Sequence, residues 1–85
     1  MSQTIDPQQA TDLVTTSLLA IVPDADLGAL TEDADLRDAF ELDSLDFLSF
    51  VEQLARRSGQ RIDEDDYDQL RTLGSCVRYL RERAL

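Results

Sequence analysis

Residues 41–58 read Glu41-Leu42-Asp43-Ser44-Leu45-Asp46 followed by FLSFVEQLARRS. At 100° per residue from position 44 onward, most of its apolar side chains gather on one side of a helix. That side holds Phe47, Phe50, Val51 and Leu54, and the opposite side holds Asp46, Ser49, Glu52, Gln53 and Arg56. The stretch predicts a helix over 44–58 that turns its aromatic side to a core and stops at Gly59, because glycine adopts the left-handed conformation without penalty.

Ser44 stands at the start of this helix, where the first backbone N–H groups lack partners and the helix dipole is positive. Both features stabilise a phosphate, so we interpret Ser44 as a site that carries a phosphodiester. Asp43 and Ser44 are also favoured N-cap residues, and a purely structural cap explains the same pattern. Leu45 and Leu48 fall toward the polar side near Ser44, either as ordinary exposed leucines or as a small docking patch.

The composition of the chain excludes several classes of function. Its 85 residues suit one small domain over 1–85. There are 18 acidic and 8 basic residues, a net charge of -10, which excludes nucleic acid as a default partner and favours proteins with basic patches. Histidine and lysine are absent, which removes the usual neutral-pH general base and the Schiff-base nucleophile. We therefore predict no catalytic residues and no enzyme activity.

Metal and membrane sites are also not expected. Cys76 is the single cysteine, so an intrachain disulfide and a cysteine zinc site are both ruled out. The acidic runs at 24–29 and 63–68 lack the ligand pattern of an EF-hand, so we predict no metal site. No apolar run approaches the roughly 20 residues of a membrane span, and the N-terminus has no export signal. We expect a cytoplasmic monomer without a membrane span.

Further helices are predicted on both sides of the central one. Asp6-Pro7-Gln8-Gln9 has the cap, the proline and the glutamine of a capped helix start, and residues 1–5 before it are expected to be disordered. A short helix is predicted after Asp63, and a last helix is predicted after the capping residue Thr72. Each carries apolar side chains at helical spacing.

The stretch between the first two long helices is acidic and has no sustained period. Between Asp24 and Asp46, nine acidic residues accompany one basic residue, Arg37. Apolar side chains are spaced through it and can hold it to the core: Leu27, Leu30, Leu36, Ala39, Phe40 and Leu42. We predict an all-α fold, a small four-helix bundle with three longer helices and one short helix, and a long ordered first loop.

Leu42-Asp43-Ser44-Leu45-Asp46 resembles the attachment motif of acyl carrier proteins, whose serine receives 4′-phosphopantetheine from coenzyme A. The resemblance extends over about residues 6–80, and Ile62 and Thr72-Leu73 also fit it. It implies that Ser44, flanked by Asp43 and Leu45, holds the arm covalently, and that acyl groups ride as thioesters on the terminal thiol of the arm. The implied partners are a phosphopantetheinyl transferase and the acyl-loading and acyl-transferring enzymes of fatty-acid, polyketide or related lipid biosynthesis.

The resemblance also implies a docking surface on the 44–58 helix. We expect partner enzymes to contact a set of residues on it: Leu45, Asp46, Leu48, Arg56 and Arg57. The family's helix is usually more acidic, so the two arginines indicate a specialised free-standing carrier. Glu41 stands where the family often has glycine, so the turn before Ser44 has to form without the conformational freedom of glycine.

Two other functions agree with the same residues. A free-standing peptidyl carrier has the same arm and differs only in carrying an amino acid loaded by an adenylating enzyme. An unmodified acidic adaptor, whose bundle binds a protein partner, belongs to a different class. Mass spectrometry after treatment with coenzyme A and a transferase separates a carrier from an adaptor, and identification of the cargo separates the two carriers.

Overall fold

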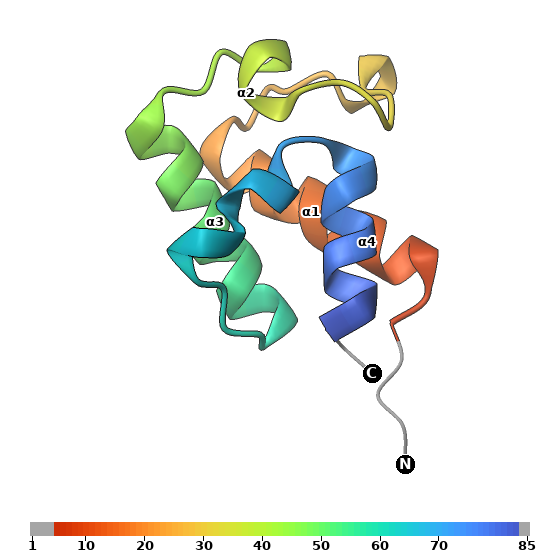
Figure 1. Ribbon diagram of the computed structural model, residues 1–85. Coiled ribbons are helices and arrows are strands. Elements are labelled where there is room, and N and C mark those ends of the chain that lie inside the picture. The colour runs from red at the N-terminus through yellow and green to blue at the C-terminus, as the bar shows by residue number, and fades with distance from the viewer. Residues whose placement is uncertain (1–4, 84–85) are drawn as a thin grey trace.

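The computed structural model describes residues 5–83, which form helices and no strand. Three longer helices, α1, α3 and α4, build the bundle, and the short 3₁₀ helix η2 is its fourth member (Figure 1). The elements in chain order are α1 (Pro7–Ile21), η1 (Leu27–Ala29), α2 (Leu36–Ala39), α3 (Ser44–Ser58), η2 (Glu64–Leu70) and α4 (Leu73–Arg83). The predicted all-α bundle of three longer helices and one short helix is confirmed.

The first helix starts as its sequence predicts. Asp6 caps α1, because its Oδ1 accepts the backbone N–H of Gln9 at 2.8 Å and its own N–H donates to Oε1 of Gln9 at 3.1 Å. Pro7 occupies the first helical position, where its missing N–H costs nothing. The buried Ser17 donates from Oγ to the Leu13 carbonyl at 2.7 Å, which satisfies this polar group inside the bundle.

A single core joins the helices. α1 packs against both α3 and α4, and η2 packs against α4. The predicted aromatic side of α3 is buried, and Phe50 and Leu54 are fully enclosed. The buried apolar residues are Ala10, Val14, Leu18, Leu36, Leu42, Phe47, Phe50, Val51, Leu54, Leu70, Cys76, Tyr79 and Leu80. Tyr79 was not predicted to lie in the core.

The acidic segment between α1 and α3 crosses the end of the bundle at which α3 and α4 begin (Figure 1). It is ordered by two short helices, η1 and α2, and by backbone hydrogen bonds to the start of α4. The N–H of Leu36 donates to the Arg71 carbonyl at 2.7 Å, and the N–H of Gly74 donates to the Glu32 carbonyl at 3.0 Å. The apolar side chains hold it to the core as predicted, with one exception: Ala39 is exposed, because the single turn of α2 buries Leu36 instead.

The N-terminal segment differs from the expectation at one residue. Ile5 was included in the disordered segment 1–5, but it is half-buried against the core, and its carbonyl accepts a hydrogen bond from Nε of Arg81 at 3.1 Å. The prediction for residues 1–4 lies outside the described residues.

The ends of the later helices follow local sequence signals. Gly59 ends α3 in the left-handed conformation, with φ of 70°. Thr72 caps α4, because its Oγ1 accepts the N–H of Ser75 at 3.0 Å. η2 is fastened to α4 by Asp66, whose Oδ2 accepts the Tyr79 hydroxyl at 2.8 Å and lies 3.5 Å from Nη1 of Arg83.

Candidate functional site

Ser44 is the first residue of α3, and its side chain is exposed. Asp43 is the N-cap, because its Oδ1 accepts the N–H of Asp46 at 2.8 Å. The structure therefore decides between the two possible caps and leaves the Ser44 hydroxyl free for chemistry. The N–H groups of Ser44 and Leu45 have no acceptor within the described part of the chain, so the positive end of the helix faces the serine.

The turn before Ser44 is tightly held. The N–H of Leu42 donates to the Arg37 carbonyl at 2.9 Å, and Nε of Arg37 donates back to the Leu42 carbonyl at 3.4 Å. Glu41, inside this turn, has φ of 52°, in the left-handed region that favours glycine. Glu41 therefore adopts, with some strain, the conformation that glycine would adopt freely. The turn still leads directly into α3.

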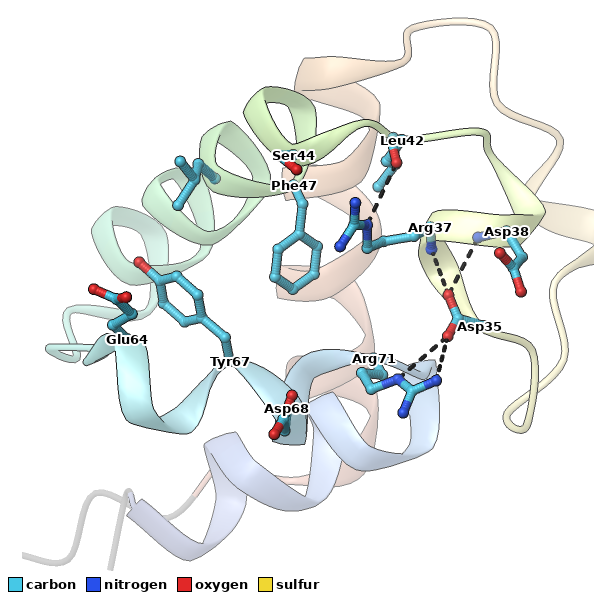
Figure 2. A pocket seen from close by; sticks show the side chains of 11 residues that line it. Asp35, Arg37, Asp38, Leu42, Ser44, Phe47, Glu64, Tyr67, Asp68 and Arg71 are labelled. Carbon is cyan, nitrogen blue, oxygen red and sulfur yellow. Dashed lines mark hydrogen bonds and ion pairs between the residues drawn. The ribbon is translucent and has the colours of Figure 1, made fainter.

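An open groove of about 810 Å³ runs from Ser44 between α3, α2 and η2 (Figure 2). Three of its lining residues, Ser44, Phe47 and Leu48, come from α3, and segments 35–42 and 64–71 supply the rest. The complete lining is Asp35, Arg37, Asp38, Leu42, Ser44, Phe47, Leu48, Glu64, Tyr67, Asp68 and Arg71. A volume of this size lies within the range of small-molecule sites in proteins.

Charged side chains surround an aromatic centre in this groove. Nη2 of Arg71 lies 3.2 Å from Oδ2 of Asp35, and the guanidinium of Arg37 lies over the Phe47 ring at 5.6 Å from its centroid. The Phe47 and Tyr67 rings meet edge to face at 6.0 Å. The pKa of Asp35 is held below its ordinary value, first by the hydrogen bond from the Asp38 N–H and also by Arg71, while desolvation opposes this shift.

The expected docking residues are placed in two groups along α3. Leu45 and Leu48, beside Ser44, are 73% and 40% exposed, so the core does not use them. Arg56 and Arg57 are exposed at the far end of the helix, and Arg56 lies roughly 18 Å from Ser44 along the axis at about 1.5 Å per residue. Asp46 is half-buried in the first turn. The two leucines thus lie beside Ser44, and the two arginines lie at the opposite end of α3.

Most of the groove was not predicted from the sequence. One feature of the sequence could have pointed to Arg37: it is the single basic residue among the acidic residues of the first loop. Tyr67 belongs to the short helix predicted after Asp63, but the sequence does not show that it shares a groove with Ser44. Asp35 and Arg71 gave no local signal, since they are 36 positions apart and meet only in the folded chain.

Other kinds of site were sought in the same residues. Over residues 5–83, no three histidine, cysteine, aspartate or glutamate side chains are placed to hold a metal ion. The helices of this region are all too short or too polar to cross a membrane.

An exposed serine at a helix start, next to free N–H groups and an open groove, fits a phosphate-linked arm. A small helical bundle with such a site suits a protein that carries a covalently attached group. A family model described as a phosphopantetheine attachment site matches residues 12–80. Over 68 residues, 75% of this chain and 87% of the relative, the chain is 37% identical to the acyl carrier protein of Chlamydia trachomatis serovar D.

A second relative supports the same assignment. The chain is 32% identical over 56 residues, 66% of this chain and 70% of the relative, to the acyl carrier protein of Lactobacillus johnsonii. The chain therefore belongs to the acyl carrier protein family. It is a carrier and not an enzyme, and its cofactor is 4′-phosphopantetheine.

Proposed function

We propose that the Ser44 hydroxyl is the attachment point of 4′-phosphopantetheine. The observation that carries the proposal is the exposed position of Ser44 at the first residue of α3, beside two N–H groups that have no acceptor within residues 5–83. These groups and the helix dipole favour negative charge at this oxygen. Asp43 supports the site indirectly, because its cap fixes the first turn in which Ser44 stands.

The attachment is a phosphoryl transfer from coenzyme A. A phosphopantetheinyl transferase joins the serine oxygen to the phosphorus of the pantetheine phosphate, the pyrophosphate bond breaks, and adenosine 3′,5′-bisphosphate leaves. The serine proton goes to a base on the transferase. Leu45, next to the serine and largely exposed, gives the transferase an apolar contact.

The cargo is an acyl group, held as a thioester on the terminal thiol of the arm. The relatives named acyl carrier proteins support an acyl cargo. A flexible arm raises the effective concentration of this cargo at any enzyme that docks near Ser44, so weak docking is sufficient. The pathway is fatty-acid, polyketide or related lipid biosynthesis.

Partner enzymes dock on the exposed side of α3. Leu45 and Leu48 supply apolar contact, and Asp46 with the acidic first loop attracts basic patches on the partner. Arg56 and Arg57 extend the footprint to the other end of the helix, where they disfavour enzymes adapted to uniformly acidic carriers.

The attachment is tested by intact-mass measurement. The purified apo chain is incubated with coenzyme A and a broad-specificity phosphopantetheinyl transferase, in parallel with Ser44→Ala and with the matched control Ser49→Ala, an exposed serine on the same helix. We expect the mass of one arm on the parent and on Ser49→Ala, and no gain on Ser44→Ala. An arm on Ser44→Ala, or no arm on the parent, contradicts the proposal.

A further inference from the structure

A phosphodiester at Ser44 adds negative charge to a place that already carries several carboxylates. Asp43 and Asp46 flank the serine, and Glu41 lies in the turn before it. Like charges at such short separations repel, and the screening length at physiological salt is about 8 Å. The half charge of the helix start offsets only part of this repulsion. A cation close to Ser44 would offset the rest of this repulsion and favour an arm that lies against the protein.

Two guanidinium groups line the groove that starts at Ser44, and one of them is already occupied. Arg71 donates to Oδ2 of Asp35 from Nη2 at 3.2 Å and from Nε at 3.4 Å. Arg37 donates from Nε to the Leu42 carbonyl, and its two Nη atoms have no acceptor within residues 5–83. Arg56 is too distant, at the other end of α3. Arg37 is thus the groove cation that is available for a new anion.

Arg37 is also held in place on the serine's side of the groove. Its backbone and its Nε exchange hydrogen bonds with Leu42, and its guanidinium lies over the ring of Phe47, which follows Ser44 by three residues on α3. Residues three apart on a helix lie on the same face. Figure 2 shows the guanidinium of Arg37 between the Phe47 ring and the turn that leads to Ser44.

We propose that Arg37 is a positioning residue for the prosthetic arm: its guanidinium pairs with the phosphodiester on Ser44 and turns the arm into the groove. The inference rests on the proposed attachment at Ser44. Arginine suits the role because its fork of donors binds phosphate oxygens in a bidentate manner. The rings of Phe47 and Tyr67 and the side chain of Leu48 give the arm an apolar surface, and Glu64 and Asp68 accept hydrogen bonds from its amide groups.

The pair is exposed, so its strength depends on salt. Exposed ion pairs are weak, and at 1 M salt the screening length is only about 3 Å. We therefore expect a holo protein in which the arm exchanges between the groove and solvent. At low ionic strength the groove is favoured, and high salt shifts the arm to solvent.

The test is NMR spectroscopy of the arm on the intact holo protein. Parent, Arg37→Gln, Arg37→Lys and the control Arg78→Gln, which removes another exposed charge, on α4, are modified with a transferase. Nuclear Overhauser contacts are then measured between the methyl groups of the arm and the rings of Phe47 and Tyr67. We expect these contacts in the parent and in Arg78→Gln, weaker contacts in Arg37→Lys, and a loss of at least about threefold in Arg37→Gln. In the parent, 1 M sodium chloride should give a similar loss.

The outcomes separate the two proposals. Absence of a mass gain before the NMR measurement refutes the attachment itself. With the arm attached, contacts that are absent in the parent, or equal in the parent and Arg37→Gln at low salt, overturn the role of Arg37. The salt series on the parent decides the point if Arg37→Gln does not fold, because contacts that persist unchanged at 1 M salt also overturn it.

Discussion

At the scale of single residues, Glu41 carries the backbone strain of the site. Its φ of 52° is the one left-handed value among the described non-glycine residues. A non-glycine residue in this region costs on the order of 1 kcal/mol or more. Glycine removes this cost, but it also increases the conformational entropy of the unfolded chain, which offsets part of the stabilisation. We predict that Glu41→Gly is more stable than Glu41→Ala by about 1 kcal/mol.

The comparison with Glu41→Ala isolates the backbone effect. Both variants remove the same carboxylate from the acidic segment, and only glycine relieves the left-handed conformation. The free energy of unfolding is measured by urea denaturation of both variants at the same salt concentration. If the alanine variant is as stable as the glycine variant, strain at this position is not significant.

Single residues also show which parts of the site can be predicted from sequence. The caps Asp6 and Thr72 and the stop at Gly59 depend on neighbours within a few positions, and the local pattern predicted them. Arg37 and Tyr79 act through contacts that exist only after folding, with the Phe47 ring and with Asp66 on η2. Helical spacing shows which side of a helix is apolar, but not which loop will cover it.

At the scale of elements, η2 depends on its contact with α4. A 3₁₀ helix has poorer hydrogen-bond geometry than an α-helix, so η2 needs tertiary support. Tyr79 supplies it through its hydroxyl, 2.8 Å from Oδ2 of Asp66. We predict that Tyr79→Phe weakens this contact by about 1.5 kcal/mol, the scale of a hydrogen bond to a charged group. Tyr67→Phe is the control, since the Tyr67 hydroxyl has no partner within residues 5–83.

The reactivity of the Cys76 thiol can be used to measure how often η2 separates from α4. Its thiol is fully buried, with Sγ 3.4 Å from the Leu70 carbonyl at the end of η2, and burial raises its pKa to about 12. A thiol reagent therefore reacts only when the two elements separate. We expect labelling about tenfold faster in Tyr79→Phe than in the parent, because 1.4 kcal/mol is a factor of ten. Equal rates in Tyr79→Phe and Tyr67→Phe would show that the hydroxyl does not hold η2.

The raised pKa of Tyr79 also leads us to expect that the folded state loses stability at alkaline pH. Burial, and then the hydrogen bond to Asp66, raise the pKa of Tyr79 to about 12, while an unperturbed tyrosine titrates near 10. Its contribution is therefore complete below about pH 10 and is lost as the pH rises through 12. We predict that the stability difference between parent and Tyr79→Phe shrinks from pH 9 to pH 12. The raised pKa of Cys76 acts in both proteins and cancels in this comparison.

The outer side of α3 is the element proposed to select partners. Arg56 and Arg57 are exposed there, and within the described residues neither forms an ion pair. We predict that replacing both with glutamate speeds acyl transfer by a general fatty-acid synthase acyltransferase at low salt, because the variant attracts a basic patch. The gain should disappear at high salt. Identical rates for the parent and the double variant at low salt would show that these arginines do not select partners.

At the scale of the whole molecule, charge is unevenly distributed. Nine acidic residues lie between Asp24 and Asp46 in a chain with a net charge of -10, and their repulsion opposes folding at low salt. We predict that 0.5 M sodium chloride raises Tm by about 5 °C, since 1 kcal/mol shifts Tm by about 4–8 °C in a domain of this size. A Tm that does not change with salt would exclude charge crowding as a significant term.

A matched pair of variants locates this effect. Asp24→Asn with Asp33→Asn removes two exposed charges from the acidic segment, and Glu52→Gln with Glu82→Gln removes two exposed charges from α3 and α4. The first pair should raise Tm at low salt and reduce its response to salt. The second pair should change Tm and its response to salt less, because Glu52 and Glu82 lie outside the acidic segment.

The bundle as a whole was predictable because its long helices repeat their apolar positions over several turns. The predicted helix over 44–58 has the observed bounds, and its four core residues are buried. α2, with four residues, is too short to show a period, and its exposed Ala39 was wrongly expected to be in the core. The groove at Ser44 could not be predicted, because three separate segments form it.

Ser44 itself is proposed to bear the arm. Loss of modification in Ser44→Ala is indirect evidence, because the same change could also disturb recognition by the transferase. Fragmentation mass spectrometry of the modified parent chain locates the arm without any substitution. We predict that the fragment containing Ser44 bears one phosphopantetheine group and that fragments with Ser2, Ser17, Ser49, Ser58 or Ser75 bear none. An arm on any of these other serines would contradict the account.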